Sequence, residues 1–300
     1  MGKSQIYHES AKTHHGMDVA GSPGNVENAR HFLKTINGHR IPRTLSFDEF
    51  LEQLYADPQK ILRNVFQLFH DMIKTYVGDG VDEYPEDAES INYVHYDFSN
   101  LFVEGVDYPF FADRLFANRL VNLAETLKRS AQQNKIYIFR GPPGSGKSTF
   151  LNTLLLKFEE YTGTAEGLTL RTVWQIPPHE LGFEGGGYGC ELNPDKPLEI
   201  PCPSYDHPIL LIPKQYRSEF FRALFDGEPF LEKLLFDKEY DWIWRGEPCT
   251  ICSSMYQALL ERLKDSSQVF KMVGASPYRY NRRLGEGINV FMPGDKPIRE

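Results

Sequence analysis

The sequence has few cysteines, no excess of positive charge and no long apolar run. Four cysteines among 300 residues are too few for the disulfide framework of a small secreted protein. The formal net charge of −8 offers no basic surface to attract nucleic acid or anionic lipid. No apolar run approaches the roughly 18–20 residues that a membrane helix requires, and the N-terminal residues lack a signal-peptide pattern. These absences predict a cytoplasmic protein that binds neither nucleic acid nor membrane.

Shifts in composition divide the chain into three predicted regions. Residues 1–40 are polar and have no periodicity, which is typical of a flexible arm. Residues 41–80 carry two amphipathic patterns and predict a small helical module. An acidic, turn-rich segment follows, and residues 90–300 then predict an α/β core with a cysteine-containing insertion.

Hydrophobic periodicity predicts where the main elements lie. Ser46 and Glu49 have the spacing of a capping box at the start of a helix, and a second helix is predicted from about residue 59 to 76. A long amphipathic helix is expected before residue 130, and a strand at residues 168–176. The last third of the chain predicts mainly helices.

One short motif in the core points to a nucleotide. Residues 141–148, GPPGSGKS, fit the phosphate-loop pattern G-x-x-x-x-G-K-[ST] without a mismatch. The apolar residues 136–139 before the motif predict a strand buried on both faces of a parallel sheet. The residues after it predict a helix from about Lys147 to Tyr161, ended by Gly163. Strand, loop and helix follow in the order that phosphate binding requires.

Each residue type in the motif has a physical role. Glycines let the backbone N–H groups turn inward toward phosphates, and the helix N-terminus adds donors and a partial positive charge. Lys147 is predicted to reach the β- and γ-phosphates as the candidate catalytic residue, and Ser148 to bind Mg²⁺. The predicted nucleotide-binding residues are Gly141, Pro142, Pro143, Gly144, Ser145, Gly146, Lys147, Ser148 and Thr149.

Hydrolysis or transfer of phosphate also needs a second acidic residue, normally at the end of a buried strand. After the motif, the only candidates are Asp237 and Glu239 in KLLFDKE. Because these follow three apolar residues in a helical pattern, the end of an amphipathic helix is the better prediction. We therefore expect the chain to be part of a longer one, with the acidic strand beyond Glu300.

Five segments carry a resemblance to a known family. They are LSFDEFLEQLYADPQKILRNVFQLFHDMI, NLFVEGVDYPFFADRLFANRLVNL, IYIFRGPPGSGKSTFLNTL, CPSYDHPILLIPKQYR and NRRLGEGINVFMPGD, and they span most of residues 45–295. With these segments the chain resembles the N-terminal AAA domain of the PrkA family of bacterial serine protein kinases. The resemblance implies an AAA-type P-loop core with a parallel sheet flanked by helices, ATP as the ligand and a cytoplasmic setting. It also implies a protein substrate phosphorylated on serine, and assembly into a homo-oligomer through the AAA core.

The residues themselves leave the reaction open. The motif set of eukaryotic-type protein kinases is absent, since there is no H-R-D loop and YDFSN at Asp97 is not D-F-G. Kinase chemistry here would therefore use the phosphate loop. An AAA motor or protease-like machine would pass the phosphate to water with the same loop. A nucleotide-gated binding module without catalysis is a third hypothesis.

The four cysteines are candidate ligands for Zn²⁺. Cys249 and Cys252 form a C-x-x-C pair, whereas Cys190 and Cys202 are separated by eleven residues. Zinc bound by all four cysteines, or by three of them with His207, is one interpretation. Free thiols in a cytosolic protein are another, and redox chemistry is a third.

Two further groups have a functional and a structural interpretation. Arg279, Arg282 and Arg283 include a candidate arginine finger for a neighbouring subunit, although packing or solvation is the more usual role of such arginines. The aromatic residues Tyr108, Phe110, Phe111 and Phe116 are candidates for the wall of an adenine pocket, and core packing is the favoured prediction for them.

Overall fold

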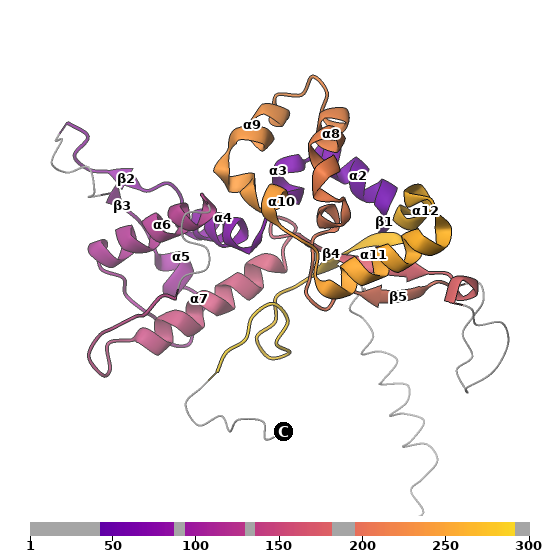
Figure 1. The fold of residues 1–300 in the computed structure, drawn as a ribbon. Helices are drawn as coiled ribbons and strands as arrows, with labels where there is room; N and C mark the ends of the chain where they lie inside the picture. The colour runs from indigo at the N-terminus through magenta and orange to yellow at the C-terminus, as the bar shows by residue number, and fades with distance from the viewer. Residues whose placement is uncertain (1–42, 87–93, 130–135, 182–195, 292–300) are drawn as a thin grey trace, which may run out of the picture. The chain divides into compact units, whose positions relative to one another are not determined.

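The computed structural model describes residues 43–86, 94–129, 136–181 and 196–291 (Figure 1). The arm predicted at residues 1–40 lies outside them. The described part is a mixture of helices and antiparallel sheet. No helix within these ranges combines the length and the apolar character needed to cross a membrane.

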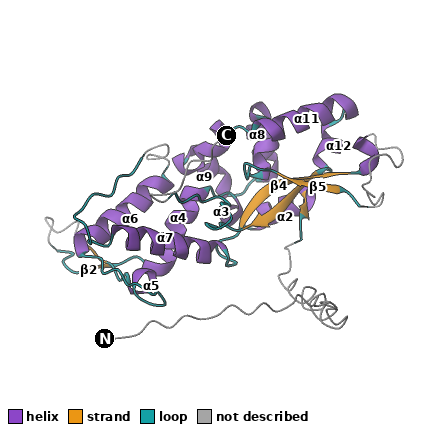
Figure 2. Ribbon diagram, turned by 90° about the horizontal axis from the view of Figure 1, so that it is seen from below, coloured by secondary structure: helices purple, strands orange, loops and turns teal. Residues whose placement is uncertain are grey.

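The main sheet has four strands in the order β1-β6-β4-β5, drawn in orange in Figure 2. Strand β4 lies in the middle and pairs with β6 from Thr169↔Tyr278 to Trp174↔Val273, and with β5 from Val173↔Pro201 to Ile176↔Leu198. Its β-branched and aromatic residues suit this buried position. The strands are β1 (Leu45–Ser46), β4 (Thr169–Ile176), β5 (Leu198–Pro201) and β6 (Val273–Tyr278).

The sheet confirms one strand prediction and corrects another. The strand expected at residues 168–176 is β4. Residues 136–139, expected to be a buried parallel strand, are not a β-strand, and Ile136 and Ile138 are 91% and 70% exposed. A parallel strand needs other strands along its edges, and every strand pair within the described ranges is antiparallel. The fold class is therefore mixed helix and sheet, without a parallel P-loop core in this part of the chain.

A first hydrophobic cluster packs helices onto this sheet, and we call it the sheet cluster. It includes the fully buried side chains of Phe50, Trp174, Phe221 and Leu234. Its helices are α2 (Phe47–Ala56), α3 (Pro58–Ile61), α8 (Lys214–Leu224), α9 (Phe230–Phe236), α10 (Asp241–Arg245), α11 (Thr250–Leu263) and α12 (Ser266–Phe270), with short 3₁₀ turns at η3 (Pro208–Leu211) and η4 (Lys238–Tyr240). A further 3₁₀ turn, η2 (Pro178–Leu181), follows β4 in the sequence.

A second hydrophobic cluster, the helix cluster, joins four helices around buried aromatic and aliphatic residues. Phe102 and Phe150 are in contact within it, with ring centroids 5.5 Å apart, and Phe158, Leu68 and Leu120 are buried members of the same cluster. The helices are α4 (Val65–Val77), α5 (Ser99–Phe102), α6 (Arg114–Lys128) and α7 (Lys147–Thr162). A two-stranded hairpin of β2 (Val81–Asp82) and β3 (Val94–His95) lies between α4 and α5 in the sequence.

Capping residues explain where the first helices begin. The capping box predicted at Ser46 and Glu49 is confirmed, since the Glu49 N–H donates to Ser46 Oγ at 3.2 Å and the Ser46 N–H donates to the Glu49 carboxylate at 2.8 Å. A second capping box, formed by Asn64 and Gln67, starts α4. The single helix predicted at residues 59–76 is therefore two helices, α3 and α4, because Asn64 starts a new one.

The helical predictions for the rest of the chain are confirmed. Helix α7 runs from Lys147 to Thr162 and ends at Gly163. The sequence KLLFDKE closes α9 at Phe236 and continues into η4, so Asp237 and Glu239 follow a helix and not a strand. Glu239 instead forms an ion pair with Lys233 at 3.3 Å.

Candidate functional site

The glycine-rich loop turns directly into helix α7. Gly144 and Gly146 have φ angles of 78° and 77°. These values lie in the left-handed region, which residues other than glycine rarely adopt. Gly146 is the N-cap of α7, and no side chain caps this helix end. The first backbone N–H groups of α7 are therefore left for an anionic ligand, together with the positive end of the helix dipole.

An aromatic residue holds the loop from one side. A Cβ added to Gly146 would lie 3.0 Å from Cδ2 of Phe110. The Phe110 ring contacts Phe150 on the first turns of α7, with ring centroids 5.6 Å apart. The loop and the start of α7 thus rest on the helix cluster, which fixes the direction in which the N–H groups point.

Lys147 folds back over the loop that precedes it. Its Nζ donates hydrogen bonds to the carbonyl oxygens of Gly141 at 2.9 Å and Pro142 at 2.7 Å, and to Ser145 Oγ at 3.2 Å. These contacts hold the ammonium group beside the loop. A phosphate oxygen is a stronger partner than a neutral carbonyl, because the hydrogen bond is then charged on both sides.

A cavity of about 550 Å³ opens beside the loop. Gly141, Pro142, Ser145 and Lys147 form its loop side. The opposite walls are aromatic and aliphatic, and this volume lies within the usual range for small-molecule sites. The apolar lining residues are Phe110, Phe111, Phe116, Leu120, Leu123, Ile138, Phe139 and Phe150.

The aromatic residues named from the sequence divide between two roles. Phe110 and Phe116 pack against Phe150, as core residues do, and also line the cavity. Phe111 lines the cavity while it is 77% exposed, and Tyr108 is equally exposed. The favoured prediction of core packing is confirmed for Phe110 and Phe116 and is wrong for Tyr108 and Phe111, which are too exposed for it.

The charged groups that line the cavity favour an anion. Lys147, Arg119 and Arg140 are cationic, and Asp113 is the one carboxylate among the lining residues. Asp113 caps helix α6 by accepting the Phe116 N–H at 2.7 Å. A polyanion in the cavity therefore has three cations within its walls.

Arg282 has a structural role within the chain. Its Nε donates to the Glu159 carboxylate on α7 at 2.7 Å, and its guanidinium also donates to the carbonyl oxygen of Asn152 at 3.1 Å. These contacts fit the packing interpretation of Arg282. Arg283, the next residue, is exposed.

Three of the four cysteines lie together, and an aspartate joins them. The ligand atoms of Cys202, Asp206, Cys249 and Cys252 all lie within 4.8 Å of one another. The hydrogen bond from the Cys252 thiol holds the pKa of Cys202 below its usual value. Cys190 lies outside the described residues. Asp206 was not a sequence candidate, although its place four residues after Cys202 was a usable signal.

His207 does not join this group. Its Nε2 lies 3.1 Å from the carbonyl oxygen of Ile61, and its Nδ1 accepts the Ile209 N–H at 3.3 Å. Burial lowers the pKa of its imidazole to about 4. Both ring nitrogens are therefore used within the protein, and His207 is a core residue that starts η3.

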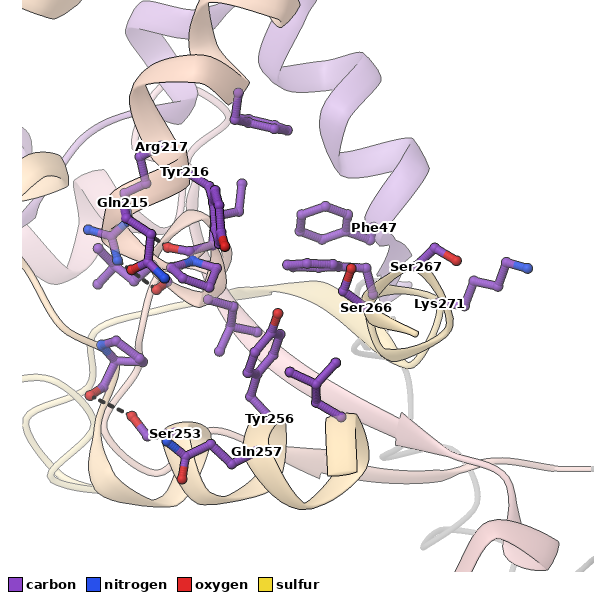
Figure 3. Close-up of a pocket in the computed structure, with 18 of the residues that line it drawn as sticks. Phe47, Gln215, Tyr216, Arg217, Ser253, Tyr256, Gln257, Ser266, Ser267 and Lys271 are labelled. Carbon is purple, nitrogen blue, oxygen red and sulfur yellow. Dashed lines mark hydrogen bonds between the residues drawn. The ribbon is translucent and has the colours of Figure 1, made fainter. Parts of the chain in front are cut away.

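A larger groove of about 1050 Å³ lies among α2, α8, α11 and α12 (Figure 3). Tyr256 reaches into it from α11, opposite Tyr216 on α8. Arg217 lies in its wall and donates to four backbone carbonyl oxygens, those of Leu210, Ile212, Ile243 and Gly246. The groove is lined mainly by apolar and neutral polar groups.

Comparisons of the chain with family models, with curated proteins and with solved structures gave no match.

Proposed function

We propose that this chain binds Mg²⁺–ATP at the loop of residues 141–149 and uses it for phosphoryl transfer to protein serine, as a PrkA-like kinase. One observation carries the proposal: a complete phosphate-loop motif lies at a helix N-terminus without a side-chain cap, beside a cavity lined by aromatic and cationic groups. The motif, the helix end and the cavity each favour a nucleoside triphosphate.

The residues around the loop fit the parts of ATP. The triphosphate belongs at the N–H groups of α7, where Lys147 offers its ammonium group to the β- and γ-phosphates. Ser148 would hold Mg²⁺ through its hydroxyl, and Thr149 would contact the α-phosphate. The base belongs against Phe110 and Phe116, whose rings stack well on a planar heterocycle. Mg²⁺ would supply charge neutralisation between the phosphates.

The proposal includes an AAA-type nucleotide site. Its support is the phosphate-loop motif that leads directly into helix α7. Assembly of several copies through the core is part of the same proposal, and the exposed Arg279 and Arg283 are the two candidate arginines left to serve a neighbouring copy.

The identity of the phosphate acceptor separates two forms of the proposal. The resemblance to PrkA kinases favours a serine hydroxyl, whereas an AAA motor uses water. Both need Lys147 and Mg²⁺, so loss of the loop abolishes either reaction.

The test follows labelled phosphate from γ-labelled ATP, with the full-length gene product and Mg²⁺. We expect label on protein serine in the wild type and none in Lys147→Ala. Lys271→Ala, which removes an exposed lysine outside the phosphate-loop cavity, is the matched control and should behave as the wild type. Label found only as free phosphate would identify an ATPase and reject the kinase assignment. Labelling that persists in Lys147→Ala would reject the loop as the site.

A further inference from the structure

We propose that Cys202, Asp206, Cys249 and Cys252 bind one structural zinc ion that ties the turn after β5 to the start of α11. This inference is independent of the proposed nucleotide site. It replaces the ligand sets suggested by the sequence, since Asp206 takes the place of Cys190 or His207 as the fourth ligand.

The spacing of the ligand atoms suits a single tetrahedral ion. Zinc–sulfur bonds of about 2.3 Å at tetrahedral angles place two sulfurs about 3.8 Å apart. The Sγ atoms of Cys202 and Cys249 are 3.7 Å apart. Since all four ligand atoms lie within 4.8 Å of one another, one ion fits among them with small side-chain adjustments.

The backbone around the cysteines supports thiolate ligands. The Asp206 N–H points to Cys202 Sγ, and the Cys252 N–H points to Cys249 Sγ, both at 3.4 Å. Such N–H donors stabilise negative charge on sulfur and fix the direction of the thiolate. Cys249 is also the N-cap of α11, so the positive end of that helix faces the group.

Asp206 is held in place by contacts that need no metal. Its Oδ2 accepts the Cys249 N–H at 2.7 Å, and its carbonyl oxygen accepts the Thr172 N–H at 2.8 Å. The preceding residue, Tyr205, has a φ of 57°, a costly conformation that turns the chain back toward the cysteines. The Tyr205 ring packs on Tyr278 with centroids 4.9 Å apart, which helps to hold this turn.

The ligand types and their number indicate the metal and its role. Three thiolates favour zinc over magnesium or calcium, which prefer oxygen ligands only. Four protein ligands leave no open position for water or substrate, as in structural zinc sites. The ion would join residues 47 positions apart in the chain and fasten β5, beside β4, to α11.

Metal analysis of the chain tests the proposal. The protein is reduced, supplied with zinc, freed of excess by dialysis, and its zinc content measured. We expect one zinc per chain in the wild type and about a tenth of that or less in Cys249→Ser. The matched pair Asp206→Asn and Cys190→Ser is compared by competition with a zinc chelator: the first should lose at least about tenfold in zinc affinity because it lacks a ligand, and the second should keep the wild-type affinity.

A cobalt spectrum serves as a second measurement, on wild-type protein that folds normally. Co²⁺ in place of zinc should give the visible absorption of a tetrahedral site with thiolate charge-transfer bands. A chain without bound zinc after loading would overturn the proposal, as would loss of zinc in Cys190→Ser together with full retention in Asp206→Asn. A Cys202–Cys249 disulfide in place of metal under reducing conditions would also overturn it.

Discussion

The ammonium group of Lys147 lies 2.9 Å from the carbonyl oxygen of Gly141, the first residue of the phosphate loop. The Lys147 side chain thus folds back and hydrogen-bonds to a residue six positions earlier in its own loop. Because neutral carbonyls are weaker partners than phosphate oxygens, a nucleotide can take over these hydrogen bonds.

Gly146→Ala should weaken ATP binding more than Gly144→Ala. Both glycines have a φ near 77°, so an alanine at either position costs about 1 kcal/mol in the backbone. A Cβ at Gly146 additionally meets the Phe110 ring at 3.0 Å, whereas a Cβ at Gly144 has nothing within 4 Å. Fluorescence titration with a labelled ATP analogue measures the difference.

A Phe110→Leu change in the Gly146→Ala background provides the control for this contact. Because Phe110 also faces the proposed base, the Phe110→Leu single variant is the reference. Gly146→Ala should cost less ATP affinity in the Phe110→Leu background than in the wild type, since the ring that the new Cβ meets is gone. An equal cost of Gly146→Ala in both backgrounds would show that Phe110 does not restrain the loop.

Arg217→Met should destabilise the protein strongly. Arg217 is fully buried and donates to four backbone carbonyl oxygens, and burial lowers the pKa of its guanidinium. Methionine fills much of the volume but leaves these acceptors without donors, at an expected cost of about 3–5 kcal/mol in the free energy of unfolding. Urea unfolding measures this free energy.

Arg222→Met, on the same helix α8 but exposed, is the matched control and should change the free energy by less than about 0.5 kcal/mol. Similar values for the two variants would mean that the buried hydrogen bonds of Arg217 contribute little.

Acid should weaken the helix cluster through Asp71. Burial opposes ionisation of this carboxyl, but hydrogen bonds from His70 and Arg63 outweigh burial and hold its pKa below the ordinary 3.8. A carboxyl with a lowered pKa stabilises the folded state fully above its unfolded pKa and loses this effect as the pH falls through the folded pKa. The window is therefore below about pH 4.

Comparison of the wild type with Asp71→Asn checks this dependence. At pH 6 the variant should be less stable by about 2 kcal/mol, and the difference should shrink as the pH falls below 4. Asp226→Asn, at an exposed position, should show no such convergence. A difference between Asp71→Asn and the wild type that stays constant down to pH 3 would exclude the ion pair as its source.

Local patterns in the sequence predicted the elements whose signals are complete within a few residues. The Ser46–Glu49 capping box, the helix from Lys147 to Gly163 and strand β4 were all foreseen in this way. The Asn64–Gln67 box has the same form, so this break in the helix is also predictable from the sequence.

Other features depend on partners that sequence spacing does not reveal. Strand β6 reads VGASPY, and its glycine and proline disfavour a strand, yet pairing with β1 and β4 on either side stabilises it. Residues 136–139 have a strand-like composition but are not a strand here. A strand also needs a neighbouring strand to pair with, and the composition of a segment does not show whether one lies beside it. Asp206 lies beside the cysteines because the chain turns at Tyr205. Only the folded structure brings this turn next to the start of α11, so the sequence spacing does not predict it.

The most direct test of the central claim is calorimetric titration of the chain with Mg²⁺–ATP, for the wild type, Lys147→Ala and Lys271→Ala. The account predicts one binding site in the wild type and in Lys271→Ala. In Lys147→Ala it predicts affinity lower by about 30-fold or more, the loss expected for a charged hydrogen-bonding partner of the phosphates. Equal affinity in the wild type and Lys147→Ala, or no binding by the wild type, would contradict the assignment of this loop as the nucleotide site.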